Sequence, residues 1–253
     1  MKIILRGEIR ASFTTYHLRE FLRYFLDNSK DLEIYIHTYN IAAIKPFVSM
    51  NDHKPQDLSK VDEKRIRDYL DEDIWSCVKH VIIEDPYQVE LHGELKGKWH
   101  PEGVDRVAWK RYWRGKYEIT RYMFHKPGIN PDDFVMNTRF DICGCAWGAT
   151  SYQLQKHRII QEEIEYKPKQ NYKPFRHHIF PFAQEEYGMR YGVDNLYLGS
   201  VRTMFRLAHA FYYNVDQIYA KYDDLRNQEF LVIFEDGNIQ PKEVHSKMVS
   251  IST

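Results

Sequence analysis

Apolar positions near the start of the chain form two short runs separated by a helical pattern. The run Ile3–Leu5 predicts a buried strand that opens into a loop. Apolar residues over 14–26 recur at helical spacing, and Ser12 or Thr14 is expected to cap that helix. A second apolar run at 32–36 predicts another strand. This β-α-β order is typical of a parallel sheet with a right-handed crossover.

The rest of the chain continues the alternation. Helices are expected over 57–77, 107–124, 200–213 and 227–234, strands over 78–83 and 134–136, and a long surface loop over 167–182. Together these elements predict an α/β fold with a mostly parallel central sheet flanked by helices. Because no Gly/Ser-rich linker or internal repeat divides the sequence, we expect one domain over 1–253.

The composition is that of a globular protein with balanced charge. The 253 residues include 36 Lys+Arg and 36 Asp+Glu, and 43% are hydrophobic. This balance argues against a strong nucleic-acid binder, whose domains usually have a pI above about 9. No apolar run reaches the roughly 18 residues of a membrane span, and no signal-peptide core is recognisable at the N-terminus. The three cysteines are sparse and odd in number, so we expect a reducing, cytoplasmic compartment.

Polar residues follow three of the predicted strands, and ligands of open parallel sheets bind at the carboxyl ends of strands. Residues 7–10 follow the first strand, His37-Thr38 ends the second, and 139–141 end the fourth. Gly7 allows a ligand to approach the backbone closely, although on its own it is an ordinary turn glycine. The guanidinium of Arg10 is suited to a phosphate group.

Asp141 comes just past a buried strand, an unusual place for a solubilising acid. Its carboxylate could ligate Mg²⁺ or Mn²⁺, which prefer oxygen ligands and often share them with substrate phosphates. Arg139 could hold a diphosphate or simply neutralise Asp141, and the spacing does not choose between these roles. The sequence contains no HExxH, GxSxG, GxGxxG or GxxxxGK[ST] motif.

The segment 106–126 alternates basic and aromatic residues. It has seven bases and six rings of Trp, Tyr or Phe, but a single acid. One interpretation is a nucleic-acid-binding or nuclease module in which bases contact phosphates and rings stack. Another gives one or two of the bases to a diphosphate. A third is an amphipathic helix with its rings in the core and its bases in solvent, which zero net charge favours over nucleic acid.

Five blocks in order resemble a group of nucleotide-sugar glycosyltransferases of bacterial surface-glycan clusters and large DNA viruses. Gly-Glu-Ile-Arg-Ala-Ser-Phe at 7–13 resembles their G-Q-x-R-x-F opening, and the segment 32–39 resembles V-F-I-H-T-W. The segment 133–141 resembles Y-D-x-V-x-R-x-R-x-D, 193–200 resembles x-D-x-F-x-x-G-S, and 227–231 resembles x-P-E-x-L. Glu8 replaces the usual Gln, and Asn137-x-Arg139-x-Asp141 stands in place of a literal Asp-x-Asp.

The resemblance implies a GT-A-like fold and transfer of a hexose or pentose from a UDP- or GDP-sugar to a glycan hydroxyl. It implies a nucleotide-sugar-binding half over 1–141 and an acceptor-binding half over 142–253. Residues implied to bind the donor are Gly7, Glu8, Arg10, His37, Thr38 and Arg139, with Arg10 and Arg139 on the diphosphate. His37 and Thr38 would lie beside the base or ribose.

The remaining implied roles belong to the metal and the catalytic base. Asp141 would hold Mn²⁺ or Mg²⁺, which stabilises the leaving diphosphate. Asp194 is the first candidate for the base, with Glu186 and its neighbour Glu185 as alternatives. Asp194 could equally be an N-cap or loop acid before the helix at 200–213. The resemblance also leaves open a catalytically inactive nucleotide-sugar binder.

Overall fold

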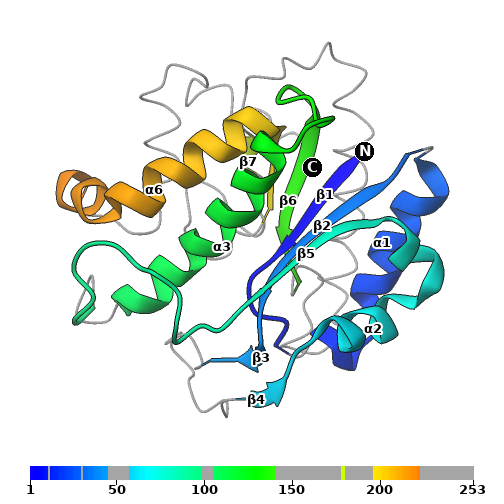
Figure 1. Ribbon diagram of the computed structural model, residues 1–253, viewed down its shortest axis with the longest axis horizontal. Coiled ribbons are helices and arrows are strands. Elements are labelled where there is room, and N and C mark those ends of the chain that lie inside the picture. Colours follow the sequence, from blue (N-terminus) through cyan, green and yellow to red (C-terminus); the bar gives the residue numbers. More distant parts are fainter. Residues whose placement is uncertain are drawn as a thin grey trace, which may run out of the picture.

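The computed structural model describes residues 1–10, 12–29, 31–44, 57–98, 105–140, 178–179 and 196–222. Within them, a six-stranded sheet has the order β5-β2-β1-β6-β8-β7 (Figure 1). The strands are β1 (Lys2–Arg6), β2 (Glu33–Tyr39), β5 (Val78–Glu84), β6 (Phe134–Arg139), β7 (His178–Ile179) and β8 (Leu196–Ser200). The first four are parallel, whereas β8 runs antiparallel to both β6 and β7. The predicted α/β class and mostly parallel sheet are confirmed.

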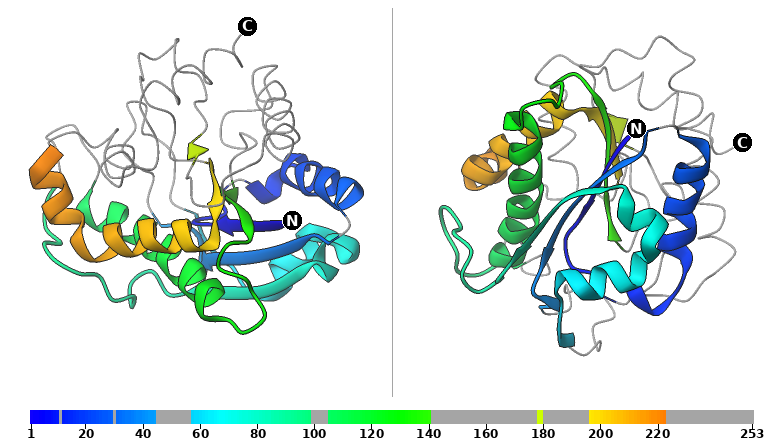
Figure 2. Two further views of the ribbon diagram at one scale, coloured as in Figure 1. Left: turned by 90° about the horizontal axis from the view of Figure 1, so that it is seen from above. Right: turned by 45° about the vertical axis from the view of Figure 1, so that its right-hand side comes forward.

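Helices cover both faces of the sheet, as the two views of Figure 2 show. One face packs against α1 (His17–Asn28) and α2 (Glu63–Ser76), and the other against α3 (Arg106–His125) and α6 (Val201–Tyr222). Side chains of β1 alternate between the two cores, with Ile3 and Leu5 on the α1 side and Ile4 on the α3 side. This alternation explains why the first strand appears in the sequence as an unbroken apolar run.

The predicted helix over 57–77 is too long at its N-terminal end. Residues 57–60 form the strand β4 (Asp57–Lys60), which pairs with β3 (Ile41–Ala43) in a separate two-stranded sheet. The helix begins after Asp62, whose side chain accepts a hydrogen bond from the Arg65 N–H. Asp62 is therefore the N-cap, and residues 57–61 before it are too few for apolar spacing to separate a strand from a helix.

The cap expected for the first helix is also wrong. Ser12 and Thr14 belong to a 3-10 turn, Ser12–Thr14, and the N-cap position of α1 is Tyr16, which makes no side-chain cap bond. Helix α1 therefore depends on its buried face rather than on a capping side chain. That face consists of Leu18, Phe21, Leu22 and Phe25.

The C-terminal half is described only in part. Helix α6 extends well beyond the predicted 200–213, and β8 precedes it directly. Ser200 Oγ accepts a hydrogen bond from the Thr203 N–H at 3.1 Å, which satisfies a free donor at the helix start. The predicted helix over 227–234 lies outside the described residues, as does the predicted loop over 167–182 apart from β7. Among the described helices, none is both long enough and apolar enough to cross a bilayer.

Candidate functional site

The strand order creates a switch point between β1 and β6. From β1 the chain crosses through α1 to β2 on one side, and it later returns through α3, on the opposite face, to β6 on the other side. Ligands of open α/β sheets bind outside the carboxyl ends of the strands at such a point. The turn 7–10 follows β1, and Arg139 ends β6, so both lie at this position.

The turn after β1 is held on both sides of Gly7 by the end of β2. The Gly7 N–H donates to the His37 carbonyl at 3.0 Å, and Thr38 Oγ1 donates to the Gly7 carbonyl at 2.9 Å. Gly7 has a φ of 88°, where glycine avoids the steric cost of a Cβ. Arg10 has a φ of 46°, which is uncommon for a residue with a side chain. Backbone strain of this kind concentrates at binding sites, which supports a binding role for the turn.

Glu8 is the acidic member of the turn. Burial raises the pKa of its carboxyl, and the positive charges of Arg10 and Arg139 act in the opposite direction. Arg10 Nε donates to Glu8 Oε2 at 3.4 Å. Because the folded pKa lies above the ordinary value of 4.5, ionisation of Glu8 lowers the stability of the fold as the pH rises through that range. A buried carboxyl maintained against such a cost is typical of a functional site.

Basic side chains gather on the α3 side of the two central strands. Arg6 and Arg139 are neighbours in the register of β1 and β6. The buried guanidinium of Arg6 donates through Nε to Asn137 Oδ1 at 2.7 Å and lies 4.7 Å from the ring centroid of Tyr112. Lys116 Nζ lies 4.0 Å from the same ring, and the residue is 2% exposed. Three positive charges therefore lie close to the carboxyl ends of β1 and β6.

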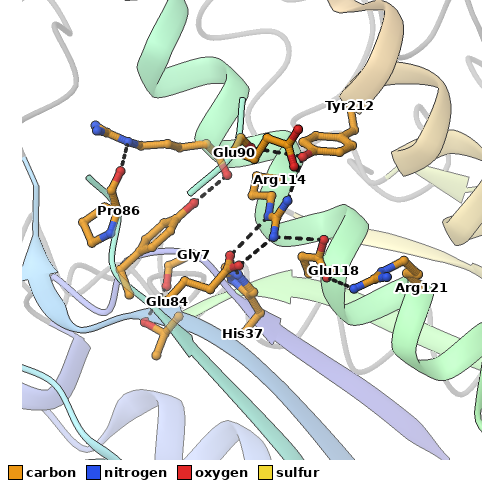
Figure 3. A network of polar contacts seen from close by, with 12 residues as sticks. Gly7, His37, Glu84, Pro86, Glu90, Arg114, Glu118, Arg121 and Tyr212 are labelled. Atoms are coloured by element: carbon orange, nitrogen blue, oxygen red, sulfur yellow. Dashed lines mark hydrogen bonds and ion pairs between the residues drawn. The ribbon is translucent and has the colours of Figure 1, made fainter. Parts of the chain in front are cut away.

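A charged network joins β2, β5 and α3 beside the turn (Figure 3). His37 Nε2 lies 2.8 Å from Glu84 Oε2, and Arg114 donates to Glu84 Oε1 at 2.9 Å. Burial opposes the ionisation of Glu84, but the hydrogen bonds from His37 and Arg114 outweigh it and hold the pKa of Glu84 at about 2. Glu84 is thus a carboxylate at neutral pH, and it fixes a proton on Nε2 of the buried His37.

The network continues from Arg114 to α6 and to the segment that follows β5. Arg114 Nη1 donates to the Tyr212 hydroxyl at 2.7 Å, and that hydroxyl donates to the Glu90 carbonyl at 3.0 Å (Figure 3). Glu118 Oε1 lies 3.1 Å from Arg114 Nη2, and its other oxygen pairs with Arg121. The carboxyl end of β5 is in this way tied to both helices of one face.

The bases of α3 point largely into the protein. Lys110 is 2% exposed and pairs with Asp216 of α6 at 2.7 Å, and Arg114 pairs with Glu84. Several rings of the helix are buried in the core, as its amphipathic pattern predicted; they are Trp109, Trp113 and Tyr117. The expectation that the bases are solvated is wrong for Lys110 and Lys116, because both are buried. Side chains engaged in this way are not arranged to track a nucleic-acid backbone.

The residues predicted for the site fall into three groups. Gly7, Glu8, Arg10 and Arg139 come together at the switch point. His37 and Thr38 are both 0% exposed and hold the turn through hydrogen bonds, so their side chains face the protein interior rather than an open surface. Asp141, Asp194 and Glu186 lie outside the described residues.

Sequence reasoning missed Arg6, Glu84 and Arg114. Arg6 follows the apolar run Ile3–Leu5, but it shares a face of β1 with Ile4, which places its side chain on the α3 side of that strand. Glu84 directly follows the strand predicted over 78–83, and this polar strand end is the signal that was available for it. Arg114 offered no local signal, because its role depends on a contact across 30 residues of sequence.

No metal centre is visible in the part of the chain that is described. Among those residues, no group of three or more His, Cys, Asp or Glu side chains is placed to hold a metal ion. The sequence-based metal ligand Asp141 falls outside this region.

Comparisons with known proteins complete the description. No protein-family model matches the sequence, and no curated protein matches it. Among solved structures, the chain is similar to the galactosyltransferase LgtC, determined in complex with donor and acceptor sugar analogs. That match covers 92% of this chain and 70% of LgtC at 9% sequence identity, with a TM-score of 0.42. A likeness at this level carries no argument about activity, so the functional case rests on the site itself.

Proposed function

We propose that the protein is a GT-A-like glycosyltransferase that moves a sugar from a nucleotide-sugar donor, a UDP- or GDP-sugar, to a glycan hydroxyl. The observation that supports this most is the location of the turn 7–10 and Arg139 at the switch point between β1 and β6. This is where a doubly wound sheet binds a phosphorylated ligand. The resemblance of the five sequence blocks points to the same donor class.

The proposed chemistry divides between a leaving group and an attacking hydroxyl. The bond between the sugar and the diphosphate breaks, and a new bond forms to the acceptor oxygen, whose proton passes to a carboxylate base. Arg139 and Arg10 would stabilise the negative charge that develops on the diphosphate. Gly7 would let the donor approach the main chain, and Glu8 would orient Arg10 through their hydrogen bond.

Two carboxylates outside the described residues complete the proposal. Asp194 is the proposed base, with Glu186 as its alternative. Asp141 is the proposed ligand of Mn²⁺ or Mg²⁺, and a bound divalent cation would neutralise part of the diphosphate charge. The arginines at the switch point are suited to the same charge, so the donor site does not depend on the metal alone.

Donor binding tests the proposal. We expect one class among UDP-, GDP-, CMP- and dTDP-sugars to raise the melting temperature, because a ligand that binds only the folded state stabilises it. Arg139→Ala should lower the affinity for that donor by about 10–100-fold, which corresponds to the usual contribution of a hydrogen bond to a charged group. Arg67→Ala is the matched control, since Arg67 lies on α2 and pairs with the exposed Glu72. No shift with any donor, or equal shifts in both variants, would contradict the proposal.

The carboxylates are tested separately. Asp194→Asn should leave the donor-induced shift intact and lower transfer by about 100-fold or more, since general-base catalysis contributes about 10²–10⁴-fold. Asp141→Ala should remove any effect of Mn²⁺ on the donor-induced shift. Transfer near the wild-type rate in Asp194→Asn would move the base to Glu186, and an unchanged effect of Mn²⁺ would remove Asp141 as the ligand.

A further inference from the structure

The ring of His37 is confined on two sides. One nitrogen, Nε2, faces the carboxylate of Glu84 at 2.8 Å. The other, Nδ1, is buried and has no hydrogen-bond partner among the described residues. It faces α3 at Gly115, where a Cβ would lie 2.8 Å from Nδ1 and 2.9 Å from Cε1. Contacts this short do not occur in proteins, so a side chain larger than hydrogen at position 115 would displace the ring.

The same residue holds the turn at the switch point. The main-chain carbonyl of His37 accepts the Gly7 N–H, and the next residue, Thr38, donates its hydroxyl to the Gly7 carbonyl. Both peptide groups of Gly7 are therefore aligned by the last residues of β2. If the His37 ring is displaced, the His37 carbonyl that accepts the Gly7 N–H is expected to move with it, because both belong to one residue.

We propose that His37 is a positioning residue, held between Glu84 and Gly115, that sets the geometry of the turn 7–10. Because its buried ring contacts α3 and β5, the orientation of the Gly7 peptide depends on where these two elements lie. This inference rests on the proposed function only in so far as the turn is the donor site. It assigns His37 a role through Gly7 in place of direct contact with the nucleoside.

The helix contributes a contact surface that only glycine can provide. Glycine is less favourable than alanine at an interior helical position such as 115. The contact with His37 explains why the helix carries glycine at this position. Glu84 holds the ring from the opposite side and is itself fixed by Arg114, which comes one position before Gly115 in α3. The two constraints on His37 thus originate in the same helical turn.

Hydrogen exchange of the Gly7 amide tests the inference without any ligand. In Gly115→Ala, we expect this amide to exchange about tenfold faster relative to the amides of the β1 core, because local opening of the turn becomes easier. Thr120→Ala is the matched control. Thr120 is buried in the same helix, but among the residues that the structure describes its hydroxyl donates to the helix carbonyls of Lys116 and Tyr117 alone.

Glu84→Gln is the second variant, in case Gly115→Ala does not fold. It preserves the shape and an acceptor oxygen for Nε2 but loses the charge, which makes the hydrogen bond about half as strong. We expect the Gly7 amide to exchange about fivefold faster in this variant. The inference is overturned if the amide exchanges as slowly in every folded variant of this set as it does in Thr120→Ala.

Donor kinetics link the inference to the site. With the UDP- or GDP-sugar that stabilises the wild type, Gly115→Ala should raise the donor KM about tenfold and change kcat by less than about twofold. A variant that only lowers overall stability would leave KM unchanged at a temperature where it is folded. If the wild type binds none of the four donor classes, the proposed function fails, whereas the exchange of Gly7 still decides whether His37 positions the turn.

Discussion

Replacing Glu84 by alanine is expected to lower the free energy of unfolding by about 3–5 kcal/mol, as for other partly buried ion pairs that lose one partner. The carboxylate accepts from His37 and from Arg114, and its side chain is only 18% exposed. Its removal leaves both partners without the group that compensates their burial. Denaturation in urea, with the midpoint compared at constant slope, measures the loss.

Glu72→Ala is the control for this prediction. Glu72 pairs with Arg67 at 2.9 Å, but its side chain is 74% exposed. Exposed pairs contribute about 0–1 kcal/mol, so the control should unfold close to the wild type. Equal losses in the two variants would show that the network around Glu84 contributes no more to the free energy of unfolding than an exposed ion pair.

The same network predicts how stability depends on pH. The pKa of Glu84 is about 2 in the folded protein and 4.5 ordinarily. Because the folded state binds this proton less tightly, the contribution of Glu84 is fully present above pH 4.5 and is lost as the pH falls towards 2. Glu84→Gln should lack this part of the acid slope. Superimposable stability profiles of Glu84→Gln and the wild type below pH 5 would contradict the assignment.

Gly93→Ala is expected to lower the free energy of unfolding by about 2–4 kcal/mol, combining a left-handed backbone cost of about 1–2 kcal/mol with a displaced ion pair. Gly93 has a φ of 75°, and a Cβ there would lie 1.8 Å from Asp216 Oδ2. That oxygen accepts from Lys110 Nζ at 2.7 Å and from the Glu94 N–H at 3.0 Å. The methyl group would therefore push the carboxylate away from a buried ammonium.

Gly97→Ala separates the cost of the left-handed backbone from the cost of displacing the ion pair. Gly97 has a φ of 79°, and a Cβ there would meet nothing within 4 Å. Its cost should be the backbone term alone, about 1–2 kcal/mol. Thermal unfolding of both variants gives the difference. If Gly97→Ala is as destabilising as Gly93→Ala, the contact with Asp216 contributes nothing.

Local pattern was sufficient for much of the fold. The apolar runs that became β1, β2, β5 and β6 and the helical spacing of α1 and α3 are short-range properties, since they arise from periods of two and 3.6 residues. They also placed Gly7, Arg10 and Arg139 after strand ends, and a parallel sheet brings such ends to one edge. The turn 7–10, which we propose binds the donor, was therefore predictable before any contact was known.

The contacts among the site residues come from the packing of segments that lie far apart in the sequence. The resemblance implies that His37 lies beside the base or ribose, whereas in the structure its ring packs against helix α3 at Gly115. The spacing of the rings indicates the apolar face of α3, but it does not show which residues of other elements that face will contact. Arg6 and Asn137 meet across 131 residues of chain, and Lys110 meets Asp216 across 106. Local periodicity predicts most of the strands and helices and the edge that carries polar residues, although residues 57–60 form a strand where a helix is expected. The packing of α3 determines which of its charges are buried, because a buried charge needs a compensating group, as Lys110 has in Asp216 and Arg114 has in Glu84.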